Sequence, residues 1–199
     1  IDVARGRTIP DRAIAIKGGD IVAVGADAKV ARNHPARQSI DATGKFVMPG
    51  LWDMHVHFGG GPELIEENKD LLPLYVANGV TTVRDAAADI SDSVLAWREQ
   101  ISAGTLLGPT IFTSGPKLEG YKPLWKGTIE VGTPAEVDAA LDRLQAMKVD
   151  FVKITDNTLK PEIFLYAVKA AKARGLKTSA HTPFALTIEE AAKAGLSSV

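Results

Sequence analysis

The sequence of 199 residues contains no cysteine, which excludes disulfide frameworks, thiolate metal sites and cysteine nucleophiles within it. No apolar run approaches the roughly 18 residues that a membrane helix needs. Charge of either sign is not in excess, because 23 Lys and Arg face 24 Asp and Glu, a formal net charge of −1. The chain therefore has no basic field for nucleic acid or anionic membranes. We expect a soluble protein, cytoplasmic or periplasmic, with a small-molecule partner, no nucleic acid and no membrane; homo-oligomerisation is left open.

The composition that is present, 45% apolar and 24% charged, is typical of a globular protein. In residues 1–50, short apolar runs at 13–16 and 21–25 flank the turn signal Gly18-Gly19-Asp20, which predicts a hairpin. A second pair of strands is predicted within 39–48, around a turn at 41–45. We therefore predict that residues 1–50 form part of a small β-sandwich domain.

From residue 51 to 199 the pattern changes to alternating strands and helices. Helical stretches end in glycine, as at Gly79 and Gly175, and one begins with the capping-box pair Thr133 and Glu136. Strands are expected at 51–57, 80–85, 109–114, 149–154 and 176–181, with a sixth beginning at Leu196. Repeated βα units predict a parallel sheet, either doubly wound or a closed barrel. Their spacing favours a (β/α)8 TIM-type barrel, of which 51–199 would be the first five to six βα units, truncated in strand six.

The segment Asp53-Met54-His55-Val56-His57 lies in the first of these strands. Residues two apart on a strand point to the same side, with attachment points about 7 Å apart, so both imidazoles can converge on one metal ion. Nitrogen ligands without sulfur suit zinc, and equally manganese, iron, cobalt or nickel. The alternative is a histidine pair packed into the core.

The stretch 49–57 resembles the strand-one signature of the amidohydrolase superfamily. The resemblance extends to Gly79-Val80-Thr81-Thr82-Val83-Arg84-Asp85 and runs over essentially the whole chain. It is greatest with the imidazolonepropionase-like and prolidase-like branch. In that family the two histidines of the first strand bind the more buried metal ion, and the resemblance implies this role for His55 and His57.

Lys153, in the fourth strand, is flanked by apolar residues. Burial favours the neutral amine of a lysine, and a neutral amine can react with carbon dioxide to give an anionic carbamate. In the resembled family a lysine here is carboxylated and bridges two metals. His181 ends the fifth strand at the rim where barrel active sites lie, and by resemblance binds the second, more exposed metal. The alternatives are a lysine whose head reaches solvent and an ordinary polar rim histidine.

Two other residues are weaker candidates. Asp85 closes the second strand and could orient a ligand histidine, although an Arg84–Asp85 ion pair explains it equally well. Tyr121 follows the third strand, where substrate loops lie, and is a candidate for substrate binding.

The resemblance implies an amidohydrolase that cleaves an amide or peptide-like C–N bond, as a dipeptidase, amidase or cyclic amidohydrolase, with a hydroxide bridging two divalent metals, zinc first. Its cofactors would be two metal ions and carbon dioxide, as a carbamate on Lys153. No catalytic residue beyond the ligands is expected in this segment, because the family's sixth-strand histidine and eighth-strand aspartate lie outside it. The rivals are a mononuclear deaminase with Lys153 unmodified and a non-catalytic relative.

Overall fold

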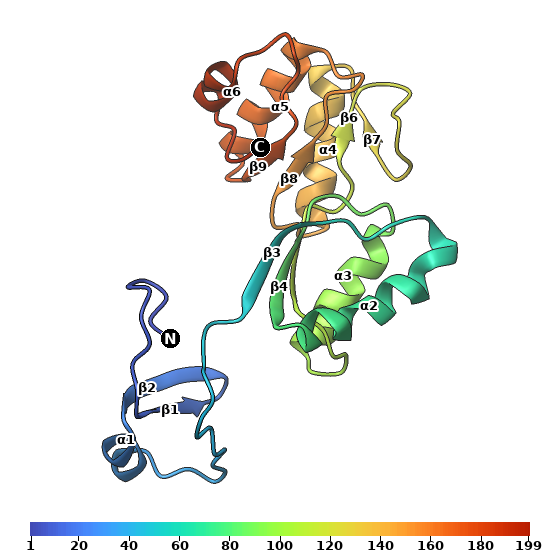
Figure 1. Ribbon diagram of the computed structural model, residues 1–199. Helices are drawn as coiled ribbons and strands as arrows, with labels where there is room; N and C mark the ends of the chain where they lie inside the picture. Colours follow the sequence, from blue (N-terminus) through green and yellow to red (C-terminus); the bar gives the residue numbers. More distant parts are fainter. The chain divides into compact units, whose positions relative to one another are not determined.

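The computed structural model describes residues 1–199, which divide into two compact units, Ile1–Pro49 and Gly50–Val199 (Figure 1). The first unit contains an antiparallel hairpin of β1 (Arg12–Lys17) and β2 (Asp20–Ala26), followed by α1 (Asp27–Asn33). Gly18 and Gly19 connect the strands with φ of 62° and 91°, values that glycine adopts without steric cost. The expected hairpin is therefore present, whereas the short helix α1 was not predicted.

The strand pair predicted within 39–48 is wrong, because no strand forms between residues 34 and 50. The local turn does form, since Thr43 N donates to Asp41 Oδ1 over 2.9 Å and Lys45 N donates to Ala42 O over 2.9 Å. The flanking apolar side chains have no partner strand, and Ile40 and Phe46 are 84% and 75% exposed. Turn chemistry is local, but a strand needs a neighbour to pair its backbone groups.

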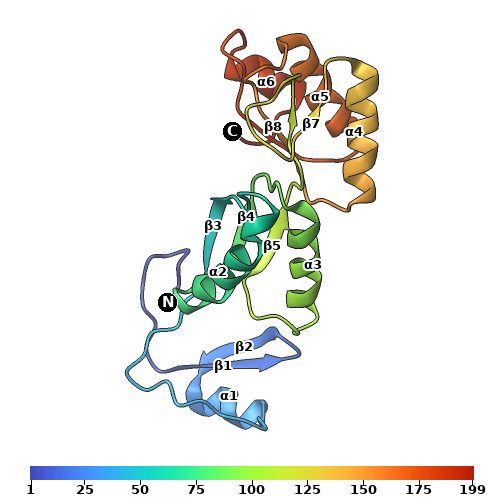
Figure 2. The ribbon, with the colours of Figure 1, turned by 90° about the vertical axis from the view of Figure 1, so that its right-hand side faces the viewer.

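The second unit begins with a three-stranded parallel sheet in the order β3-β4-β5. Two helices, α2 and α3, lie against this sheet (Figure 2). Their apolar side chains and those of the strands enclose a core that includes Leu72, Val83, Val94 and Trp97. The elements are β3 (Leu51–Val56), the 3-10 turn η1 (Pro62–Leu64), α2 (Ile65–Ala77), β4 (Val80–Asp85), α3 (Ser91–Ser102) and β5 (Thr110–Thr113).

A second parallel sheet follows, in the order β7-β6-β8-β9. On the helix after Thr133, the side chains of Val137, Leu141 and Leu144 form one fully buried face. The predicted capping box at Thr133 is present, and a second one forms at Thr187. The elements are β6 (Leu118–Glu119), β7 (Ile129–Glu130), α4 (Pro134–Ala146), β8 (Val152–Ile154), α5 (Pro161–Ala173), β9 (Thr178–Ala180) and α6 (Ile188–Ala194).

The fold is therefore mixed α/β with parallel sheets, and its strands do not close into a barrel within this chain. The two sheets separate at the third predicted strand. β5 pairs with β4, then Gly115 turns the backbone with φ of 60° and Pro116 lacks an N–H, and the chain resumes as β6 beside β8. Proline cannot donate to a ladder, so pairing is interrupted there. The predicted sixth strand appears only as a parallel bridge between Ser179 and Ser198.

No helix of the structure has both the length and the apolar character needed to cross a membrane.

Candidate metal centre

His55 and His57 lie at the end of β3 with their ring nitrogens facing each other. The Nε2 atoms are 3.1 Å apart, as expected for side chains two residues apart on a strand. Both side chains are exposed, so the alternative of a histidine pair packed into the core is wrong. His57 Nδ1 lies 3.1 Å from the carbonyl oxygen of Ala87, in the loop after β4. A carbonyl only accepts, so Nδ1 carries the proton and the Nε2 lone pair remains available.

Lys153 is in the middle of β8, with 1% of its surface exposed. Its Nζ is buried without a hydrogen-bond partner, so the alternative of a head group that reaches solvent is wrong. Burial lowers the pKa of the amine, and the nearby positive charges of Arg84 and Lys117 lower it further, whereas Asp156 opposes them. The surroundings of Lys153 therefore shift it toward the neutral amine.

His181 immediately follows β9, and its backbone N–H donates to the carbonyl of Ile154 on β8 over 3.1 Å. Its side chain is 58% exposed, with Nδ1 3.8 Å from Asp156 Oδ1. Burial and the charge of Lys153 lower the pKa of His181, and Asp156 raises it.

The charges of the other three candidate ligands act on His55. The pKa of His55 is lowered first by burial and then by the charges of Lys153, His57, Arg84 and His181. Only His55 and His57 are in contact, however, and no group of three His, Asp or Glu side chains is close enough to hold a metal ion.

Three of these residues have features that metal binding would use. His55 and His57 direct two nitrogens toward one point, and the lowered pKa of His55 favours its neutral ring, the form that binds metals. Lys153 supplies a buried nitrogen whose hydrogen-bonding capacity is unused. Buried polar groups without partners are uncommon in folded proteins, so this amine requires an explanation.

Asp85 is the last residue of β4 and is fully buried. Its carboxylate accepts from Thr113 Oγ1 over 2.6 Å and from Phe58 N over 3.3 Å. The predicted alternative of an Arg84–Asp85 ion pair is wrong, because Arg84 donates to Met54 O and Ser198 Oγ instead. Burial raises the pKa of Asp85 to about 7, although both hydrogen bonds oppose this rise. Asp85 thus positions the chain next to His57 through Phe58, without a hydrogen bond to either histidine.

No protein-family model matches the chain. Its sequence is 27% identical to ochratoxinase from Aspergillus niger over 128 residues, which are 57% of this chain and 26% of that protein. It is 46% identical to imidazolonepropionase from Chloroflexus aggregans over 59 residues, 30% of this chain and 14% of that protein. A putative prolidase structure from Bifidobacterium longum matches 88% of this chain and 45% of its own, with a TM-score of 0.71 and 25% identity. The predicted resemblance to the amidohydrolase superfamily is confirmed. The chain spans less than half the length of each of these three relatives.

A buried carboxylate that the superfamily resemblance did not indicate lies on β6. Glu119 is fully buried, its Oε2 accepts from Thr155 Oγ1 over 2.8 Å, and its Oε1 has no partner. The register of β6 with β8 places Glu119 and Lys153 on the same face of the sheet. The alternation Lys117-Leu118-Glu119 was the only sequence signal for this strand, and two residues are too few to recognise it.

Tyr121 follows β6, as expected for a loop residue of an amidohydrolase-like fold. Its hydroxyl donates to the carboxylate of Glu136, with distances of 2.9 and 2.7 Å to the two oxygens. Glu136 also completes the capping box of α4 with Thr133. In this structure Tyr121 therefore anchors its loop to the first turn of α4.

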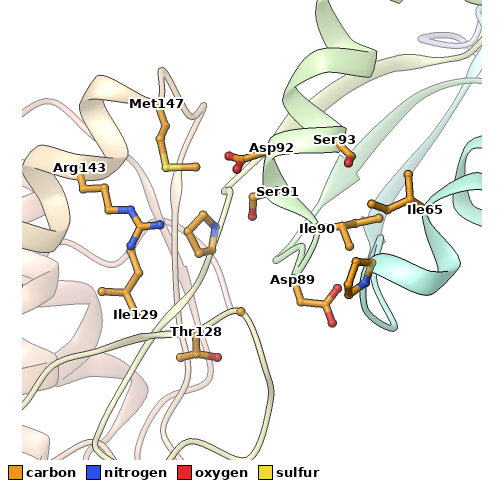
Figure 3. Close-up of a pocket in the computed structure, with 13 residues that line it drawn as sticks. Ile65, Asp89, Ile90, Ser91, Asp92, Ser93, Thr128, Ile129, Arg143 and Met147 are labelled. Atoms are coloured by element: carbon orange, nitrogen blue, oxygen red, sulfur yellow. The ribbon is translucent and has the colours of Figure 1, made fainter.

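A cavity of about 400 Å3 is lined by none of the four predicted ligands. Arg143 and Met147 of α4 line one side and Asp89 and Ile90 the other (Figure 3). Asp89 connects this cavity to the loop that follows β3, because Asp89 Oδ2 accepts a hydrogen bond from Gly60 N over 3.2 Å.

Proposed function

We propose that this chain is part of a metal-dependent hydrolase of amide or peptide-like C–N bonds, with His55, His57, Lys153 and His181 as ligands of two divalent metal ions, zinc first. The observation that carries the proposal is the buried, unpartnered Nζ of Lys153 beside two histidines whose Nε2 atoms converge. The names of the relatives, ochratoxinase and prolidase, support hydrolysis as the reaction class.

As an ammonium, Lys153 has three donors and no lone pair for a metal. As a neutral amine it would attack the carbon of carbon dioxide, so that a C–N bond forms, one C–O π bond breaks and one proton leaves to solvent. The product would be an anionic carbamate with two acceptor oxygens. Arg84 and Lys117, whose charges lower the pKa of the amine, would also stabilise the negative charge of the carbamate. The surroundings thus favour both the reactive form and its product.

Divalent metals would supply Lewis acidity, which polarises a carbonyl and lowers the pKa of water to about 7. The residues of this chain would prepare the site for them. His57 would keep its proton on Nδ1 through the Ala87 carbonyl, and the Asp156 carboxylate, 3.8 Å from His181 Nδ1, would favour the charged form of that ring. Amide and dipeptide substrates, including those with prolyl or N-acylated ends, are the proposed class.

We also propose that residues 51–199 are the first five to six βα units of a TIM-type barrel and that residues 1–50 are part of a small β-sandwich domain. The parallel order of both sheets and the match to the prolidase structure over 88% of the chain support the barrel. The break between β5 and β6 would then lie within one barrel strand.

The test counts the metal ions bound per chain and detects the carbamate on Lys153. Two metals per chain and a carbamate signal in 13C NMR after incubation with 13C-labelled bicarbonate are expected. Lys153→Met should lose the carbamate and at least one metal, whereas the control Lys169→Met, at an exposed position on α5, should keep both. One metal without a carbamate would favour the mononuclear deaminase, and no bound metal would overturn the proposal. Hydrolysis of Xaa-Pro dipeptides and N-acyl amino acids then tests the substrate class.

A further inference from the structure

The backbone of Ala87, in the loop after β4, has an unusual conformation. Its φ is 123°, in a region that only glycine occupies without steric strain. The other non-glycine residues with positive φ, Asp11, Lys122 and Lys148, have values of 52°, 57° and 55°, in the common left-handed region. Ala87 is therefore the one residue with a side chain held in this costly conformation.

The residues on both sides of Ala87 are held in place. Ala86 N donates to Val56 O over 2.9 Å, which extends the pairing of β4 with β3. Ala88 is buried, its N–H donates to Gly115 O over 3.4 Å, and its carbonyl accepts from Ser91 Oγ. The chain must therefore change direction at Ala87 alone, and strain of this kind persists only where the surroundings impose it.

The consequence of this conformation is the direction of one carbonyl. The oxygen of Ala87 lies 3.1 Å from His57 Nδ1, and the opposite nitrogen of the same ring, Nε2, faces His55 Nε2. The backbone acceptor thus selects the tautomer with the proton on Nδ1, because an imidazole that donates at Nδ1 presents its lone pair at Nε2. A side chain disfavours this φ, so the held neighbours Ala86 and Ala88 impose it, and glycine would adopt the same φ without strain.

We propose that Ala87 is a positioning residue, whose strained backbone directs its carbonyl to His57 and so fixes the tautomer and ring orientation needed for metal binding. The inference rests on the proposed metal site for its purpose, but the tautomer can be measured without any metal. Orienting groups of this kind, when mutated, typically weaken metal affinity by about 10- to 100-fold.

The first measurement is a long-range 1H–15N correlation spectrum of the imidazoles in the metal-free protein. Residues 1–199 include four histidines, and the signals of each ring can be assigned with single His→Gln variants. We expect the neutral His57 ring to carry its proton on Nδ1 in the wild type and in Ala87→Gly, which can keep this φ. In Ala87→Pro, whose ring fixes φ near about −65°, the His57 ring should become a mixture of tautomers. Predominant protonation at Nε2 in the wild type would overturn the inference.

The second measurement is a titration with Zn2+ of the wild type, Ala87→Pro and the control Ala87→Gly. Glycine adopts φ of 123° without strain, whereas proline cannot adopt it. Ala87→Gly should be at least as stable as the wild type in urea and bind Zn2+ equally well, whereas Ala87→Pro should bind Zn2+ more weakly, by about tenfold or more. Equal affinity of Ala87→Pro and wild type would overturn the inference. A wild type that binds no Zn2+ would refute the proposed function, and the tautomer spectra would still decide the role of Ala87.

Discussion

The buried carboxylate of Asp85 should make the stability of this protein fall as the pH rises toward neutrality. Its pKa is raised from 3.8 to about 7, chiefly by burial. Between these values the folded chain holds a proton on Asp85 that the unfolded chain has released. Because the folded state then binds more protons, its stability decreases with rising pH. The contribution is fully present below about pH 4 and is lost as the pH rises through about 7.

The magnitude follows from the two pKa values. Each pKa unit corresponds to about 1.4 kcal/mol, and integration of proton binding between pH 5 and pH 8 gives a loss of about 3 kcal/mol from this group. Asp85→Asn should remove the effect with little disturbance. The amide oxygen can accept from Phe58 N, and its NH2 can donate to Thr113 Oγ1, which accepts as well as donates.

The assay is urea denaturation of metal-free wild type and Asp85→Asn at several pH values between 5 and 8. Histidines titrate in the same range, so the informative quantity is the difference in unfolding free energy between the two proteins. This difference should shift in favour of Asp85→Asn by about 3 kcal/mol from pH 5 to pH 8. Asp70→Asn, at an exposed position on α2, is the control and should follow the wild type. A constant difference between wild type and Asp85→Asn would refute the reasoning.

Two further substitutions test local determinants of the fold by urea denaturation. Thr133→Ala removes the oxygen that accepts from Glu136 N at the start of α4 and should destabilise the chain by about 1 kcal/mol; unchanged stability would show that the box is not needed. Gly50→Ala would place a methyl carbon 2.0 Å from Thr81 Oγ1 and should cost about 1–3 kcal/mol. Gly175→Ala, where the new carbon meets nothing but φ is 75°, measures backbone strain without a clash, so a loss at Gly50 no larger than at Gly175 would contradict the packing argument.

The βα units of the second unit were predictable because their signals are local. The glycines after α2 and α5, Gly79 and Gly175, have positive φ as expected for helix ends. The capping boxes form as their spacing predicts. The interruption at Gly115-Pro116 was not predicted, because whether a strand continues there depends on which neighbours are available for pairing. The strands predicted in 39–48 are absent for the same reason, because no neighbouring strand pairs with this segment.

The candidate site was likewise predictable only where its signals are local. The facing of His55 and His57 follows from strand geometry, whereas the burial of Lys153 was left open, because a lysine in an apolar strand can also extend its head group to solvent. Neither the backbone conformation of Ala87 nor the partners of Asp85 could be read from residue type. A carbonyl oxygen belongs to every residue, so its role as an acceptor for His57 depends only on conformation.

Several features that cost folding free energy gather where the strands end. Asp85 is a buried carboxylate with a raised pKa, Ala87 has a strained backbone, and Lys153 is a buried amine without a partner. The helices, by contrast, follow local rules in their caps and apolar faces. Sequences that fold well agree with local preferences except where function requires otherwise. Asp85 contacts the residue after His57, Ala87 contacts His57 itself, and the charge of Lys153 acts on His55, so these three exceptions support the proposed metal site.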